Sequence, residues 1–211
     1  IAEIKKDGIK VFDFDNKQKE VKIDEIQWDL EQAQKQGYKH FMLKEIYEQP
    51  KVIEDSLKNK IIIEKNFKRI IFVACGTASY AGLVAKYLIE KIAKIPVINE
   101  TASEFRYKEP IIDENDLVIA ISQSGETADT LAAIRLAKEH GARTLGLINV
   151  VDSTIAREVE QVIYTKAGPE IGVASTKAFI SQLISGYQLA YFLADKEFRS
   201  EEVLTNIEKV L

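Results

Sequence analysis

Cysteine is nearly absent from this sequence. Cys75 is the single cysteine among 211 residues, so no disulfide can form within the chain, and we expect its side chain to pack as a small apolar group. One thiol and two distant histidines, His40 and His140, cannot assemble a thiolate–imidazole metal site. These absences predict a reducing, cytoplasmic setting and no metal or other cofactor.

Long apolar runs and excess positive charge are missing as well. No apolar stretch approaches the ~20 residues that span a bilayer, and the first ten residues contain no apolar signal core. The formal net charge of −4 argues against nucleic acid and anionic membranes as partners, because both need a basic face. What remains is an ordinary globular composition, 46% apolar and 29% charged. Since the sequence does not begin with Met, we expect it to be a piece of a longer protein.

The first 60 residues predict a hairpin and helices. Residues 9–14 and 19–23 alternate apolar and polar side chains around a polar turn, which is typical of two antiparallel strands. Helical spacing of apolar residues follows at 29–37, 41–49 and 51–59. Pro50 separates the last two of these helices, because a proline disrupts a helix that precedes it.

From residue 69 onward, short apolar runs alternate with helical patterns. The strand-like runs are 69–76, 95–100, 116–122, 144–150 and 161–168. The helical segments are 80–93, 102–107, 129–141, 176–194 and 200–211. Strands separated by helices form parallel sheets that are covered on both faces. We therefore predict an α/β fold, a three-layer α/β/α sandwich with a five-stranded parallel sheet of the flavodoxin-like kind.

Two of the predicted strands end in turns rich in hydroxyl groups. These groups are Thr77 and Ser79 after the first strand, and Ser122, Ser124 and Thr127 after the third. The carboxyl ends of parallel strands share one edge of the sheet, where such folds bind ligands. A helix N-terminus there offers unpaired N–H groups and the positive end of its dipole, which favours an anion such as phosphate.

Capping is the alternative role for these hydroxyls. A Ser or Thr before a helix commonly caps it and stabilises it by ~1 kcal/mol, but three hydroxyls between residues 122 and 127 exceed what one cap needs. Gln123 is either a solvent-facing loop residue or a donor to a sugar hydroxyl. For Glu126 we expect stabilisation of the helix dipole rather than base catalysis.

A second unusual stretch, residues 168–179, joins a glycine-containing loop to a long apolar helix. Ser175 and Thr176 could cap this helix. Glu170 or Lys177 could instead reach a bound polar ligand. The helix itself is expected to lie in the core rather than at an interface.

Four segments together resemble a known enzyme family. They are HFMLKEIYEQP (40–50), SEFRY (103–107), SQSGETADTL (122–131) and EIGVASTKAF (170–179). In this order they resemble the sugar-isomerising half of the glutamine:fructose-6-phosphate amidotransferases, also called glucosamine-6-phosphate synthases. The resemblance covers residues 29–194 and is far more specific than a lone glycine motif.

The resemblance implies a division of the chain into four parts. Residues 1–28 resemble the end of a glutaminase domain and its connector, and residues 29–60 a helical lead-in. Residues 61–195 resemble the first sugar isomerase (SIS) domain of the family. Residues 196–211 would be a helical tail toward a second SIS domain outside the chain.

The resemblance also implies a site for fructose 6-phosphate or glucosamine 6-phosphate. The family holds the phosphate with the turn that matches Ser122, Gln123, Ser124 and Thr127. Residues that line the sugar match Thr77, Ala78 and Val173. Ala78 stands where the family commonly has serine, so only its backbone N–H could contribute, and Val173 matches a backbone contact.

The family's catalytic lysine, glutamate and histidine belong to the second SIS domain, so we assign no catalytic residue here. We expect the chain to be a fragment of a glutamine–fructose-6-phosphate transaminase (isomerising), without the glutaminase domain and the second SIS domain of that enzyme. We expect this fragment to form a homodimer and to bind the sugar phosphate, but to be inactive alone. Two alternatives stay open. One is a stand-alone SIS module that senses a phosphosugar and regulates a partner; the other is a dimerisation domain whose hydroxyls only cap helices.

Overall fold

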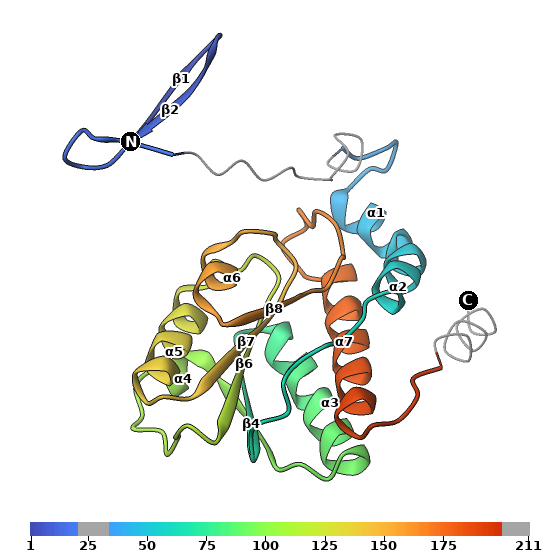
Figure 1. Cartoon of the computed structure of the whole chain (residues 1–211). Coiled ribbons are helices and arrows are strands. Elements are labelled where there is room, and N and C mark those ends of the chain that lie inside the picture. Colours follow the sequence, from blue (N-terminus) through green and yellow to red (C-terminus); the bar gives the residue numbers. More distant parts are fainter. Residues whose placement is uncertain (21–33, 200–211) are drawn as a thin grey trace.

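The computed structural model of this protein describes residues 1–20 and 34–199. Its centre is a five-stranded parallel sheet with helices on both faces (Figure 1). The strands are β4 (Arg69–Ala74), β5 (Val97–Thr101), β6 (Asp116–Ser122), β7 (Arg143–Ile148) and β8 (Gln161–Tyr164). They lie in the order β5-β4-β6-β7-β8, and every neighbouring pair is parallel. This order confirms the predicted flavodoxin-like α/β sandwich.

The central strands are buried on both faces because nearly every residue in them is apolar. In β6 all seven residues are buried. Successive side chains of a strand point to opposite faces of the sheet. In β4, Ile70 and Phe72 join one core cluster, whereas Ile71 and Val73 join the other. The sheet therefore lies between two hydrophobic cores, which explains why its strands lack the alternation of a half-exposed sheet.

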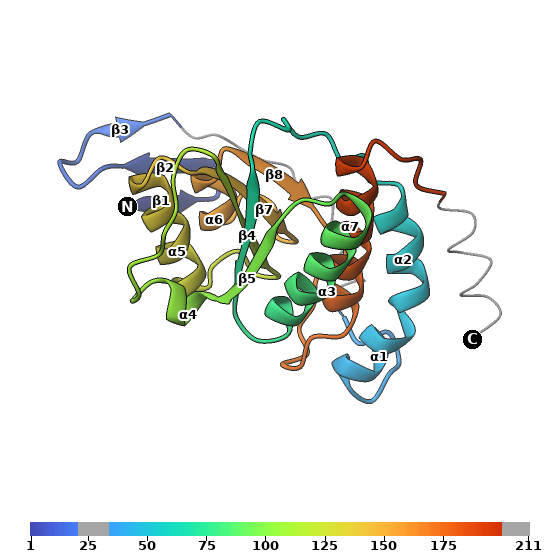
Figure 2. The same cartoon turned by 90° about the horizontal axis from the view of Figure 1, so that it is seen from below.

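Five helices cover the two faces. They are α3 (Thr77–Ile92), α4 (Ala102–Phe105), α5 (Ala128–Glu139), α6 (Thr154–Glu158) and α7 (Lys177–Leu193). The helices α3 and α7 lie on one side of the sheet, and α4, α5 and α6 on the other (Figure 2). The helix α6 is not among the predicted elements, because five residues are too few for a periodic pattern. Within the described ranges, no helix has both the length and the apolar character needed to cross a membrane.

An ion pair lies where β4 and β6 begin. Arg69 and Asp116 are partners in the parallel ladder. The Arg69 Nε and Nη2 atoms lie 2.8 and 2.6 Å from the two carboxylate oxygens of Asp116. Two parallel hydrogen bonds to one carboxylate fix the relative position of the two strands. The ladder that follows places Val73 opposite Ala120, so both strands reach the carboxyl edge of the sheet at the same level.

A three-stranded antiparallel sheet forms near the start of the chain. Its strands are β1 (Ala2–Lys5), β2 (Gly8–Phe12) and β3 (Gln18–Lys19), in that order. The pairing of β2 with β3 confirms the predicted hairpin. Part of the predicted second strand, residues 21–23, lies outside the described residues. The strand β1 is an addition to the prediction, and all four of its residues are exposed.

Two helices connect this region to the central sheet. They are α1 (Phe41–Tyr47) and α2 (Gln49–Leu57). Pro50 lies in the first turn of α2, where backbone N–H groups have no partner within the helix, so the missing N–H of proline costs no helical hydrogen bond. The break between two helices at this proline is therefore confirmed.

The predicted helix at 29–37 is wrong for residues 34–37, which form a bend and a turn. Gln36 and Gly37 have φ angles of +49° and +85°. Such left-handed backbone is incompatible with a right-handed helix. The remainder of that segment, and the predicted helix at 200–211, lie outside the described residues.

The helix α7 lies in the core, as its apolar sequence predicts. It packs beside both α3 and α2 (Figure 1). Most of its residues are buried. Gly186 allows α7 to approach α3 closely, because a Cβ atom at this position would meet the Cβ of Ala85 at 2.9 Å.

We predict that Gly186→Ala destabilises the protein. The added methyl group collides with Ala85, and overpacking of this kind costs ~1–3 kcal/mol. Urea unfolding followed by circular dichroism would measure the change in the free energy of unfolding. The double variant Gly186→Ala/Ala85→Gly removes the methyl group that the new alanine side chain would meet. Its destabilisation should therefore be smaller than the sum of the two single effects. Strict additivity of the two single effects in the double variant would contradict the close contact, and this comparison is unaffected by the ~1 kcal/mol that alanine gains over glycine within a helix.

Candidate functional site

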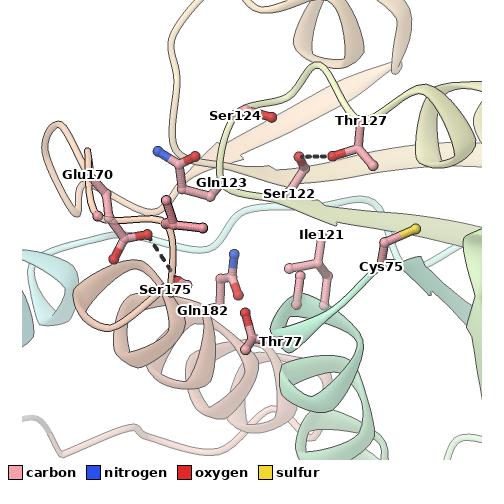
Figure 3. Close-up of a pocket in the computed structure, with 13 residues that line it drawn as sticks. Cys75, Thr77, Ile121, Ser122, Gln123, Ser124, Thr127, Glu170, Ser175 and Gln182 are labelled. Atoms are coloured by element: carbon pink, nitrogen blue, oxygen red, sulfur yellow. Dashed lines mark hydrogen bonds between the residues drawn. The ribbon is translucent and has the colours of Figure 1, made fainter. Parts of the chain in front are cut away.

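A cavity of about 210 Å³ opens at the edge of the sheet where β4 and β6 end (Figure 3). It is lined by Cys75, Thr77, Ala78, Ile121, Ser122, Gln123, Ser124, Thr127, Glu170, Gly172, Val173, Ser175 and Gln182. All seven site residues expected from the sequence are in this lining. The structure therefore gathers three separate segments around one cavity, whose small volume suits a small metabolite better than a dinucleotide.

The turn between β6 and α5 presents three hydroxyl groups. The Ser122 Oγ atom accepts the Gly125 N–H at 2.9 Å and lies 3.3 Å from the Thr127 Oγ1 atom. The Ser124 Oγ atom accepts the Glu126 N–H at 3.2 Å. A hydroxyl that accepts a hydrogen bond can still donate its own proton. The turn therefore offers O–H donors while its own shape is maintained by backbone N–H groups.

The helix α5 begins at this turn without a side-chain cap. Thr127 is the N-cap residue, yet its hydroxyl makes no capping bond to the described residues of α5. The first N–H groups of a helix then have no partner within the helix and carry the positive end of its dipole. The Thr127 hydroxyl therefore does not cap α5, and the N–H groups at the start of the helix remain available to an anion.

Gly125 is required by the shape of this turn. Its φ angle is +67°, and a Cβ atom here would overlap the Ser153 hydroxyl at the start of α6. Its carbonyl oxygen accepts the Ile155 N–H at 2.9 Å. The Gly125 backbone thus holds the turn against α6, at a distance that leaves no room for a side chain at this position.

Glu126 strengthens the same connection. Its Oε1 atom accepts the Thr154 N–H at 2.7 Å, so the carboxylate caps α6. The expectation that Glu126 stabilises the dipole of its own helix needs correction, because the residue precedes α5 and turns toward a neighbouring helix. Hydrogen bonding by the side chain and backbone N–H of Thr154 lowers the pKa of Glu126 below its ordinary value.

The turn between β4 and α3 contributes less than its two hydroxyls suggest. Thr77 and Ala78 line the cavity. The Ser79 hydroxyl instead donates to the Gly76 carbonyl oxygen at 2.7 Å and is not part of the lining. Cys75 is partly buried and packs against one of the two core clusters, as a small apolar side chain should, while it also borders the cavity.

Glu170 caps α7, a role that the sequence left to Ser175 or Thr176. The Glu170 Oε1 atom accepts the N–H groups of Thr176 and Ala178 at 2.9 and 3.1 Å. Its Oε2 atom accepts the Ser175 hydroxyl at 3.0 Å. Because the Glu170 carboxylate occupies the first turn of the helix, neither hydroxyl is needed as a cap there.

Lys177 does not reach the cavity, so its suggested contact with a ligand is wrong. The residue is 2% exposed, and its Nζ atom lies 2.6 Å from a carboxylate oxygen of Glu48. Glu48 also lies 3.2 Å from the Nζ atom of Lys44 in α1. The two buried ammonium groups share the partly buried Glu48 carboxylate, which ties the start of α7 to α1, because unpaired charges are costly in the interior.

Glu45 holds the loop on the remaining side of the cavity. This residue of α1 is buried, and its Oε1 atom accepts the Ile171 N–H at 2.6 Å and the Gly172 N–H at 3.1 Å. The sequence expectations do not include Glu45, since its partners lie more than 120 residues away along the chain. No local pattern marks Glu45, because the apolar residues Leu43 and Ile46 beside it in α1 are exposed while Glu45 itself is buried.

The charge distribution favours neutral donors over ionic contacts. Within the described part of the chain, Glu170 is the only charged residue of the lining. Figure 3 places Glu170 and Thr127 on opposite sides of the cavity. No group of three or more His, Cys, Asp or Glu residues in the described ranges could hold a metal ion. The arrangement can bind an anion through hydroxyl and backbone donors, with sugar-like hydroxyls beside it.

Comparisons with known proteins point in the same direction. The sequence matches the SIS domain family over residues 62–191. It is 51% identical to a glutamine–fructose-6-phosphate aminotransferase [isomerizing] from Clostridium tetani, over 97% of this chain and 36% of that protein. The chain thus spans about a third of the length of the curated relatives it matches.

Solved structures give a similar result. The C-terminal domain of a glucosamine-fructose-6-phosphate aminotransferase from Francisella tularensis superimposes with a TM-score of 0.76 at 39% identity, over 84% of this chain and 55% of that one. A glucosamine-6-phosphate deaminase from Thermotoga maritima superimposes with a TM-score of 0.70 at 27% identity, over 79% of this chain and 53% of that one.

We predict that Glu45→Ala destabilises the protein and its cavity loop. The change removes the acceptor of the partly buried hydrogen bonds from the Ile171 and Gly172 N–H groups, and a hydrogen bond to a charged group contributes ~1.5–3 kcal/mol. Thermal unfolding and limited proteolysis would measure the effect. Glu54→Ala in α2 is the matched control, since Glu54 is half-exposed and lies 3.7 Å from Lys51. A loss of stability no larger for Glu45→Ala than for Glu54→Ala would refute the role of Glu45.

Proposed function

The chain belongs to the SIS domain family, and from this premise we propose that it is the phosphosugar-binding part of an isomerising glutamine–fructose-6-phosphate aminotransferase. The whole protein would aminate fructose 6-phosphate to glucosamine 6-phosphate, in the cytoplasm. The observation that carries the proposal is the cavity, in which a hydroxyl cluster meets the uncapped N-terminus of α5.

The phosphate is proposed to lie at the turn between β6 and α5. Gln123, Ser124 and Thr127 would surround it with neutral donors, while Ser122 maintains the turn. A dianion at this point interacts favourably with the dipole of α5, and its oxygens accept hydrogen bonds from hydroxyl and backbone groups. The sugar would then extend toward Thr77, Ala78 and Val173.

The partners of this chain are proposed to be a second copy and further domains of the same polypeptide. The aminotransferase relatives match this chain over nearly its whole length, including α1 and α2. That extent favours a part of an enzyme over a stand-alone regulatory SIS module. A glutaminase domain would supply ammonia, and a second SIS domain would supply the groups that open the sugar and move its proton.

We predict that Ser124→Ala and Thr127→Ala each weaken the binding of fructose 6-phosphate. A hydrogen bond to a charged phosphate contributes ~1.5–3 kcal/mol, so the double variant should lose about a hundredfold in affinity or more. Isothermal titration calorimetry measures the dissociation constants. Ser79→Ala is the control, because the Ser79 hydroxyl is absent from the cavity lining. Undiminished affinity in both single variants would count against the phosphate position.

We also predict that the isolated chain synthesises no glucosamine 6-phosphate. Proton transfer needs a positioned base of suitable pKa, and imine chemistry needs a lysine that can lose its proton. The described lining of the cavity contains neither lysine nor histidine, and its one carboxylate caps α7. The purified chain would be incubated with fructose 6-phosphate and ammonia, and the product assayed by mass spectrometry. Detectable turnover would show that this chain carries catalytic groups of its own.

A further inference from the structure

Gln182 is a buried polar residue at the cavity for which the fold provides no partner. It belongs to α7, is 2% exposed and lines the cavity. Its buried Oε1 atom has no hydrogen-bonding partner among the described residues. A buried amide oxygen without a partner is unfavourable, because it has lost its hydrogen bonds to water and gained none.

A second buried glutamine on the same helix behaves differently. The Gln188 Nε2 atom donates to the carbonyl oxygens of Leu57 and Asn59 at 3.2 and 3.1 Å. These bonds tie α7 to the end of α2, so Gln188 has a structural role. Gln188 is also absent from the lining of the cavity. The Gln188 Oε1 atom also has no described partner, but Gln182 makes no hydrogen bond to the described residues through either polar atom, and of the two only Gln182 lines the cavity.

We propose that Gln182 is a specificity-determining residue that hydrogen-bonds to the sugar part of the ligand. The inference deepens the proposed function and rests on it. The unpartnered Oε1 atom is an acceptor, so the ligand has to supply a donor. The amide nitrogen, which points toward the hydroxyl turn in Figure 3, can donate to either part of the ligand. A phosphate ester dianion has only acceptors and cannot satisfy the oxygen, whereas a sugar hydroxyl can donate to it. Gln182 is therefore assigned to sugar hydroxyls rather than to the phosphate.

The position of Gln182 fits this assignment. Figure 3 shows it rising from α7 toward the cavity, beside Thr77 and across from the turn that carries Ser124 and Thr127. A ligand whose phosphate contacts that turn fills a cavity of about 210 Å³ by extending toward the opposite wall. Its hydroxyl groups then meet the Gln182 amide in a site from which most water is displaced.

The test is the variant Gln182→Met, which keeps an unbranched side chain of similar length and removes the amide. The affinity of the purified chain for fructose 6-phosphate should fall about tenfold, as expected for the loss of hydrogen bonds to a neutral group. The affinity for inorganic phosphate, which has no sugar hydroxyls, should stay unchanged. The melting temperature should stay equal or rise, since an unpaired buried polar group has been removed. Gln182→Leu repeats the measurement with a branched side chain.

Gln188→Met is the matched control. It should lower the melting temperature, because the carbonyl groups of Leu57 and Asn59 lose their donor, and leave the ratio of the two affinities unchanged. Equal affinity of Gln182→Met and the parent chain for fructose 6-phosphate would overturn the inference and leave the proposed function intact. A fall in melting temperature as large as that of Gln188→Met, with both ligands weakened alike, would show a packing role and also overturn it. No binding of fructose 6-phosphate by the parent chain would overturn the proposed function itself.

Discussion

The parallel pairing of β4 with β6 is the interaction on which the site depends. The ladder runs from Arg69 opposite Asp116 to Val73 opposite Ala120, so the turns that follow the two strands begin at the same level of the sheet. The order of the strands reverses at this point, with β5 on one side of β4 and β6 on the other, and the connections diverge to opposite faces. A crevice therefore forms where the two strands end, and the start of α3 and the start of α5 both border it.

Three carboxylates around the cavity share one physical role. Glu45, Glu126 and Glu170 each accept backbone N–H groups from a loop or a helix start. Their negative charges are balanced by these donors, and two of the three residues are absent from the lining. The same groups hold the walls of the cavity in place: Glu126 fastens the hydroxyl turn to α6, while Glu45 and Glu170 fasten the loop that carries Val173. An anion can thus bind close to these acidic residues, because their carboxylates are hydrogen-bonded to backbone N–H groups and do not face the phosphate position.

The two walls of the cavity differ in the hydrogen-bonding groups that they offer to a ligand. The hydroxyl turn offers neutral donors at a helix N-terminus, which suits a phosphate without requiring a lysine or a metal ion. The opposite wall offers the Gln182 amide, which has a donor nitrogen and an unpartnered acceptor oxygen; a sugar hydroxyl can satisfy both, whereas a phosphate can satisfy only the nitrogen. A ligand that carries both groups satisfies both walls at once. The proposed role as the phosphosugar-binding part of an isomerising aminotransferase follows from this pairing, together with relatives that match almost the whole chain.

The sequence by itself determined the α/β class and the five strands, since apolar runs mark buried strands, and it placed the hydroxyls of Thr77, Ser122, Ser124 and Thr127 directly after two of them. The family resemblance of the sequence added Ala78, Gln123 and Val173 to the expected site. Only the tertiary structure decided how the hydroxyls are used, with Ser79 turned to its own backbone and Ser122 committed to the turn. It also decided that Glu170 caps α7, that Lys177 is buried against α1, that Glu45 holds the loop beside the cavity, and that Gln182 lines the cavity. For Glu45 and Lys177 the physical reason is that their partners lie more than a hundred residues away along the chain, where no local pattern can indicate them. For Ser79, Ser122 and Glu170 the partners are only three to eight residues away, and the backbone conformation of each turn decides which polar group the side chain reaches.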